Sequence, residues 1–127
     1  MNLTIWLKQY GVEDTPCDES IEAWGDQDLS LPAALAWAKD DWRLWLAERI
    51  AVEHLPEMMH DGEWRVRRAV ARRIAVEHLP EMMNDDEWLV REVVARRIAA
   101  EHLPAMMNDR DWDVRLVVAK RIKEGAA

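Results

Sequence analysis

The amino-acid sequence predicts an all-α solenoid, in which short helical repeats stack side by side. Two near-copies, at residues 61–84 and 85–108, and an incomplete third copy at residues 109–127 follow one another with a period of 24 residues. The segment RIAVEHLPEMM at residues 49–59 occurs again, letter for letter, at residues 73–83. A fixed period of this length, with no glycine or proline between residues 64 and 78, is typical of stacked helical repeats.

The length of 127 residues predicts one domain. We expect residues 1–48 to form a helical N-terminal cap and residues 49–127 to form the repeats, with a degenerate unit before residue 61. The formal net charge is −8. Most of it lies in residues 1–48, which carry ten acidic and three basic side chains. An acidic chain is unsuited to general binding of a phosphate backbone, although a local basic stripe can still attract an anionic partner.

Cys17 is the only cysteine, which excludes a disulfide framework or an iron–sulfur cluster within the chain. We therefore expect a cytoplasmic protein. The apolar run at residues 3–7 is too short for a signal peptide or a membrane span, so no membrane partner is expected. Asp18 and Glu19 beside Cys17 predict a raised thiol pKa and a thiol without a catalytic role.

The N-terminal region predicts four short helices, near residues 2–10, 18–24, 31–38 and from 41 onward. Five of the eight tryptophans lie in this region, and the first repeat of a solenoid needs bulky side chains to close its apolar end. An aromatic ligand pocket is the alternative. The tryptophans are Trp6, Trp24, Trp37, Trp42 and Trp45.

The runs CDESIEAW at residues 17–24 and LPAALAWAKDDWRLWLAERI at residues 31–50 resemble a module of many uncharacterised phage and bacterial proteins. In that module a cysteine-containing helix precedes a DW-x-LWLA segment. The resemblance implies an origin in mobile or phage-linked bacterial genes and implies no activity.

Each repeat predicts a long helix, a break and a short helix. Asp61, Asp85 and Asp109 precede the apolar-periodic segments, where a helix N-cap is expected. The first long helix is predicted to run from Trp64 to about His78, because the residue before Pro80 is pushed out of helical geometry. The segment after that proline predicts one short helical turn with inward-pointing methionines.

This unit resembles the leucine-rich repeat variant, a 24-residue relative of HEAT repeats. The resemblance implies a right-handed α-solenoid in which long helices alternate with 3₁₀ helices. The best-known member carries a cysteine-rich iron–sulfur domain, which the single cysteine excludes here. DNA glycosylases with HEAT-like repeats are a second relative, but they are larger and strongly basic. The residues that carry the resemblance are Asp61, Val66, Arg67, Ala71, Leu79 and Pro80, with counterparts at 85, 90–91, 95 and 103–104 and, in the third copy, at 109, 114–115 and 119. Trp64, Trp88 and Trp112 stand where proline is usual.

Charged side chains fall within the predicted apolar face of the long helix, so each needs a partner. We expect Asp61 to pair with Arg67 and Glu77 with Arg73, in a ladder of ion pairs between repeats. The same pairing is expected among Asp85, Arg91, Arg97 and Glu101. An arginine row that binds anions is the alternative.

No catalytic, metal or cofactor site is predicted. The repeated histidines, His54, His78 and His102, form one column, but stacked helices lie too far apart for one zinc ion to bind several of them. The paired methionines at 58–59, 82–83 and 106–107 are interpreted as core residues. An enzyme centred on Cys17 and a histidine is the minor alternative.

Positions that differ between copies predict the binding surface. They share the helix face opposite the core, and exposed Leu89 and Leu116 are the strongest indication of a partner. Drift on a solvated face is the alternative to partner contact. The predicted function is a non-catalytic protein-binding module, and its more concrete form is an immunity or inhibitor protein from a phage-linked locus. The rival hypothesis is a nucleic-acid binder that uses Arg68, Arg72, Arg96 and Lys120. The oligomeric state is left open. The predicted binding residues are Arg65, Arg68, Arg72, Leu89, Glu92, Arg96, Asp113, Leu116 and Lys120.

Overall fold

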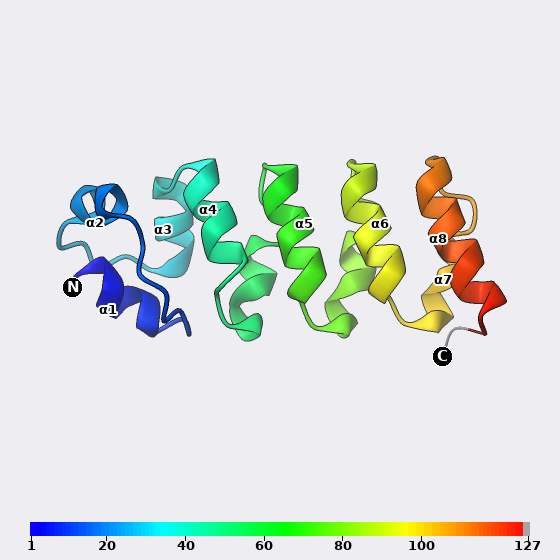
Figure 1. Ribbon diagram of the computed structural model, residues 1–127, viewed down its shortest axis with the longest axis horizontal. Coiled ribbons are helices and arrows are strands. Elements are labelled where there is room, and N and C mark those ends of the chain that lie inside the picture. The colour runs from blue at the N-terminus through cyan, green and yellow to red at the C-terminus, as the bar shows by residue number, and fades with distance from the viewer. Residues whose placement is uncertain (126–127) are drawn as a thin grey trace.

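The long helices stand in a row in the computed structural model of the protein (Figure 1). The structure describes residues 1–125, so the end of the third predicted unit, residues 126–127, lies outside it. Within the described residues every element is helical, which confirms the all-α solenoid. The elements are α1 Leu3–Lys8, α2 Asp18–Trp24, α3 Leu31–Trp37, α4 Asp40–Ala47, η1 Val52–Met58, α5 Trp64–Arg73, η2 Val76–Met82, α6 Trp88–Arg97, η3 Ala100–His102, α7 Leu103–Met106 and α8 Trp112–Lys123, where η denotes a 3₁₀ helix.

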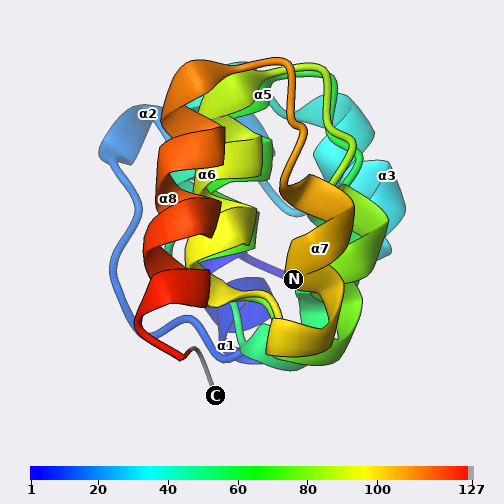
Figure 2. The same ribbon diagram turned by 90° about the vertical axis from the view of Figure 1, so that its right-hand side faces the viewer.

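The helices form two layers. An end-on view shows the long helices α5, α6 and α8 behind one another, with the short helices in a second layer beside them (Figure 2). The buried side chains form one cluster that continues from Leu3 to Val118. Ile50, Ile74 and Ile98, which are spaced by the 24-residue period, are fully buried in it. Burial of each such side chain contributes about 1.5–3 kcal/mol to folding.

The long helix α5 ends earlier than the sequence predicts. α5 ends at Arg73, and Ile74 leaves helical geometry at ψ 150°. The 3₁₀ helix η2 then contains Pro80 instead of following it. The predicted end near His78 is therefore wrong: no local breaker acts at Ile74, and the turn there keeps this side chain in the core while the chain reverses into the second layer.

The predicted N-caps are also wrong. Glu63 is the N-cap of α5, and its carboxylate accepts from the Arg65 N–H at 3.4 Å. Asp61 lies two residues earlier and accepts the Glu63 N–H at 2.9 Å, which fixes the turn before the helix. Asp85 and Asp109 accept in the same way, at 3.0 and 2.9 Å, from the residue two positions on.

The N-terminal helices lie where predicted and close one end of the row (Figure 1). Trp6 and Trp24 are buried in this region, and their indole N–H groups donate to backbone carbonyls, Trp6 to Leu29 at 2.7 Å. Gly11 has φ +79°, and a Cβ there would lie 2.9 Å from the Cβ of Ala51, so the turn after α1 requires glycine. α4 stacks against α5 as the first long helix of the row.

Candidate protein-binding surface

An aspartate–arginine ladder joins each long helix to the loop of the next repeat. The Arg67 Nε donates to Asp85 at 2.8 Å, and the Arg91 Nε donates to Asp109 at 2.9 Å. Arg43 makes the same bond with Asp61 at 2.8 Å. The predicted ladder between repeats exists, but the predicted pairing of Asp61 with Arg67 is wrong, because the Asp61 carboxylate is taken by Arg43 and only its backbone carbonyl accepts from Arg67.

These ion pairs are largely removed from water. The aspartates of the ladder are 8% exposed, and the exposed fraction of the arginine side chains is 16% for Arg43 and Arg67 and 4% for Arg91. The hydrogen bond that Arg67 donates to Asp85 raises the pKa of its guanidinium, and the bond that Arg43 donates to Asp61 does the same for Arg43. Each guanidinium therefore stays charged and holds two repeats in register.

A second set of arginines caps the long helix of the preceding repeat. Arg73 donates to the carbonyls of Ala47 and Ile50, both at 2.7 Å, and Arg97 donates to those of Ala71 and Ile74 at 2.6 and 2.8 Å. These carbonyls are left without a partner where a helix ends. Burial lowers the pKa of the Arg73 and Arg97 guanidinium groups, which form no ion pair among residues 1–125.

This arginine–carbonyl ladder replaces two predicted ion pairs. Among the described residues Glu77 and Glu101 form no bond to Arg73 or Arg97. Each guanidinium donates to two carbonyls at the negative end of a helix. These two bonds stabilise the arginine more than an ion pair with a single exposed glutamate would. Arg121 repeats the arrangement with Ala95 and Ile98, at 2.9 and 2.6 Å.

The nine predicted binding residues lie on one side of α5, α6 and α8, at positions i, i+3 and i+7 of each helix. We call them the outer strip. Arg65, Arg72, Arg96, Leu116 and Lys120 are exposed, and the remaining four are half-buried. Leu116 is 51% exposed, whereas Leu89 was predicted as exposed and is only partly so.

Ion pairs with glutamates reduce the free positive charge of the outer strip. The Arg96 Nε donates to Glu92 at 3.3 Å, and Arg65 donates to Glu63 at 3.0 Å. The Nε of Arg68 is buried and has no acceptor among the described residues. Arg72 and Lys120 are exposed and form no ion pair within the described residues, so they are the cations that a partner can reach.

The residues considered for chemistry lie apart. His54, His78 and His102 are each partly exposed at the start of a separate repeat's short-helix layer, and no group of three metal-ligating side chains occurs within residues 1–125. The methionines pack in the core except for Met107, which is 51% exposed because no further described repeat covers it.

The thiol pKa of Cys17 is shifted in the direction opposite to the prediction. The thiol is exposed at the start of α2, and its Sγ lies 3.1 Å from the Ser20 hydroxyl. The hydrogen bond with Ser20 lowers the pKa of the Cys17 thiol, although Glu19 acts in the opposite direction. The expected rise was wrong because a direct hydrogen bond outweighs an exposed carboxylate that is screened by water.

Comparison with known proteins adds the family. The family model described as leucine rich repeat variant matches residues 64–87, which is one period of the sequence. The repeat at residues 64–87 therefore matches the leucine-rich variant type. A solved structure titled "A leucine-rich repeat variant with a novel repetitive protein structural motif" aligns with a TM-score of 0.63 and 33% sequence identity, over 84% of this chain. The chain spans 41% of the length of that structure, and no curated protein matches the sequence.

The variant repeats account for the scaffold of the molecule and leave its activity open. Stacked repeats of this kind create extended surfaces. No helix among residues 1–125 is long and apolar enough to cross a membrane. The residues that sequence reasoning missed are Arg43, which begins the aspartate–arginine ladder, and the capping role of Arg73. The 24-residue spacing between Arg43 and Arg67 was the available signal.

Proposed function

We propose that this chain is a non-catalytic protein-binding module that contacts its partner through the outer strip. The observation that supports the proposal is the contrast between constant and divergent positions. Residues that join the repeats recur from copy to copy, whereas positions 65, 89 and 113 hold Arg, Leu and Asp, and positions 68, 92 and 116 hold Arg, Glu and Leu. A half-exposed leucine beside free cations suits a partner with apolar and acidic groups.

A nucleic-acid partner is the second candidate, favoured by the five basic side chains of the outer strip. Two features oppose it. Glu92 and Asp113 interrupt the row, and Arg65 and Arg96 are already paired with glutamates. A phosphate backbone rewards a continuous row of free cations, which this surface lacks.

The finer form of the proposal is an immunity or inhibitor protein that covers the surface of its partner in a one-to-one complex. Its support is the resemblance of the N-terminal run to a phage-linked module. The single cysteine is compatible with a reducing cytoplasm.

The experiment is affinity capture with the purified chain as bait, followed by the mass of the complex from light scattering. One variant carries Arg72→Glu, Leu116→Asp and Lys120→Glu, all at exposed positions of the outer strip. The matched control carries three changes at exposed positions of the short-helix layer, Val76→Asp, Glu81→Lys and Glu101→Lys.

We expect one protein to be captured by the wild type and by the control, and lost by the outer-strip variant. Equal capture by all three would refute the assignment of this surface. A labelled DNA duplex tests the rival, which predicts binding that weakens steeply with salt and is lost in the outer-strip variant.

A further inference from the structure

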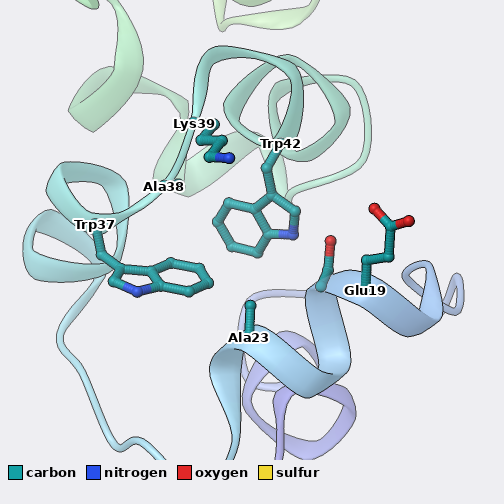
Figure 3. Close-up of a pocket in the computed structure, with 7 residues that line it drawn as sticks. Glu19, Ala23, Trp37, Ala38, Lys39 and Trp42 are labelled. Carbon is teal, nitrogen blue, oxygen red and sulfur yellow. The ribbon is translucent and has the colours of Figure 1, made fainter.

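A cleft opens between α2 and the corner that joins α3 to α4. It has a volume of about 370 Å³ and is lined by Glu19, Ala23, Trp37, Lys39 and Trp42, among others. Trp37, Trp42 and Ala23 point toward one shared space, with Glu19 at its edge (Figure 3). A neighbouring hollow of about 350 Å³ shares Glu19, Lys39 and Trp42 and extends the cleft to Asp41 and Trp45. We call the two together the tryptophan cleft.

Two indole rings meet in the cleft at nearly a right angle. The ring centroids of Trp37 and Trp42 are 6.1 Å apart, with an interplanar angle of 83°. Trp24, which is buried, holds Trp37 from behind at 5.5 Å. Trp37 itself stays 39% exposed. Such a large exposed aromatic surface, held rigidly in place, presents a ring face to a ligand at little cost in conformational entropy.

The cleft tryptophans differ from those that serve the core. Trp6 and Trp24 are buried and donate their indole N–H groups to carbonyls. The Nε1 of Trp42 is buried without an acceptor among the described residues. Satisfied indoles are typical of structural tryptophans, so packing alone does not account for the arrangement at Trp42.

The charge around the cleft is negative. Glu19 and Asp41 line it, and neither forms an ion pair within residues 1–125. Lys39 is the single cation in its lining and is exposed. Indole faces beside carboxylates attract a cation, because the ring quadrupole and the carboxylate act in the same direction. The same region already uses this interaction, since the Arg49 guanidinium lies 4.6 Å over the Trp45 ring.

We propose that the tryptophan cleft binds an arginine or lysine side chain presented by a basic segment of a partner protein. Charge complementarity selects this occupant, because residues 1–48 carry ten acidic against three basic side chains. The site is a second surface, opposite in charge to the outer strip, and it does not depend on the function proposed above. Lys39 competes with the incoming cation, so its removal strengthens binding.

The probes are three blocked pentapeptides with a central arginine, citrulline or glutamate between glycines. Citrulline has the shape of arginine without its charge. The readout is the shift of the indole N–H signals of Trp37 and Trp42 in nitrogen-15 NMR spectra, titrated to about 10 mM peptide, where a site with a Kd of about 1 mM is largely occupied. We expect saturable shifts with the arginine peptide, binding at least about fivefold weaker with citrulline, and none with glutamate.

Variants test whether the cleft prefers a positively charged ligand. Trp37→Ala and Glu19→Gln are expected to weaken arginine binding by about fivefold, and Lys39→Ala to strengthen it about twofold. The controls are Trp112→Ala, at the far end of the row and 64% exposed, and Glu22→Gln, which is exposed on α2 outside the cleft lining. Far-UV circular dichroism confirms that each variant is folded, and the glutamine variant keeps the test decisive if Trp37→Ala unfolds.

Each of the following results would overturn the assignment. Shifts with the glutamate peptide, or weaker binding in Lys39→Ala, would mean that the cleft takes an anion. Equal binding of arginine and citrulline would mean that charge plays no part. No shift with the arginine peptide at the highest concentration would exclude a cationic side chain as the occupant.

Discussion

Asp85→Asn tests the aspartate–arginine ladder at its middle pair. The carboxylate of Asp85 accepts from Arg67 at 2.8 and 3.1 Å and from the Glu87 N–H at 3.0 Å. An asparagine keeps an oxygen for the Glu87 N–H and so preserves the turn, but it removes the negative charge. Arg67 is then left 16% exposed, with a cationic group facing a neutral amide.

The cost follows from this geometry. Removing one partner of a fully buried ion pair costs about 3–5 kcal/mol, and an amide that still accepts one bond places Asp85→Asn at about 3 kcal/mol. Asp85→Ala also removes the turn hydrogen bond, which adds about 1 kcal/mol. Asp61→Asn is expected to cost less, because Arg43 keeps a second carboxylate in Asp40.

Urea unfolding at neutral pH, followed by tryptophan fluorescence and circular dichroism, measures these costs. A loss of about 3 kcal/mol lowers the midpoint by about 1–2 M urea for a chain of this size. Asp86→Asn is the matched control, since Asp86 is exposed and forms no ion pair within residues 1–125. If Asp85→Asn falls within about 0.5 kcal/mol of the control, or its cost vanishes in about 1 M salt, the ladder behaves as an exposed pair and the reasoning is refuted.

Four further variants test the rest of the scaffold and the thiol. Arg97→Lys is expected to lose about 1–2 kcal/mol in urea unfolding, because an ammonium group cannot reproduce the guanidinium fork on two carbonyls; an unchanged midpoint would argue against the arginine–carbonyl ladder. Ile74→Ala is expected to cost about 3–4 kcal/mol and Ile122→Ala less than about 1, since only the second is exposed, and equal costs would contradict the stacking. The hydrogen bond with Ser20 lowers the pKa of the Cys17 thiol, and the thiolate is the form that reacts with iodoacetamide. Alkylation should therefore become rapid at a lower pH than for an ordinary cysteine, and Ser20→Ala should move the pH–rate profile to higher pH. Superimposable profiles of the wild type and Ser20→Ala would contradict this account.

The sequence predicted the fold because the period is a property of the sequence itself. Ile74 and Ile98 could be placed in the core from their spacing, and the structure confirms both. The helix ends could not be placed in this way. The segment from Trp64 to His78 contains no residue that breaks a helix, so local preferences extend the helix past Ile74. The reversal at that residue depends on contacts with neighbouring repeats, which one repeat does not contain.

The ladder partners show a different limit. Arg67 lies between two aspartates, and it contacts the backbone of Asp61 and the carboxylate of Asp85. Spacing alone allows either pairing. Arg43 could have decided between them, because the position 24 residues before Asp61 holds Trp37, so pairing within a repeat would leave Arg43 without the aspartate that its counterparts use. Pairing with the following repeat instead completes all three bonds.

The two arginine ladders separate the scaffold of this protein from its surface. Both ladders join the long helix of one repeat to a neighbouring repeat, one through aspartate carboxylates and the other through backbone carbonyls. None of the nine outer-strip residues supplies a group to either ladder. Substitutions at Arg72 or Lys120 therefore change the charge that a partner meets without removing a bond that stacks the repeats. The outer strip could diverge between copies for this reason, while Arg73 and its counterparts could not. Stability and recognition should accordingly respond to different residues, which makes a binding loss in a fully folded outer-strip variant a direct measurement of the surface.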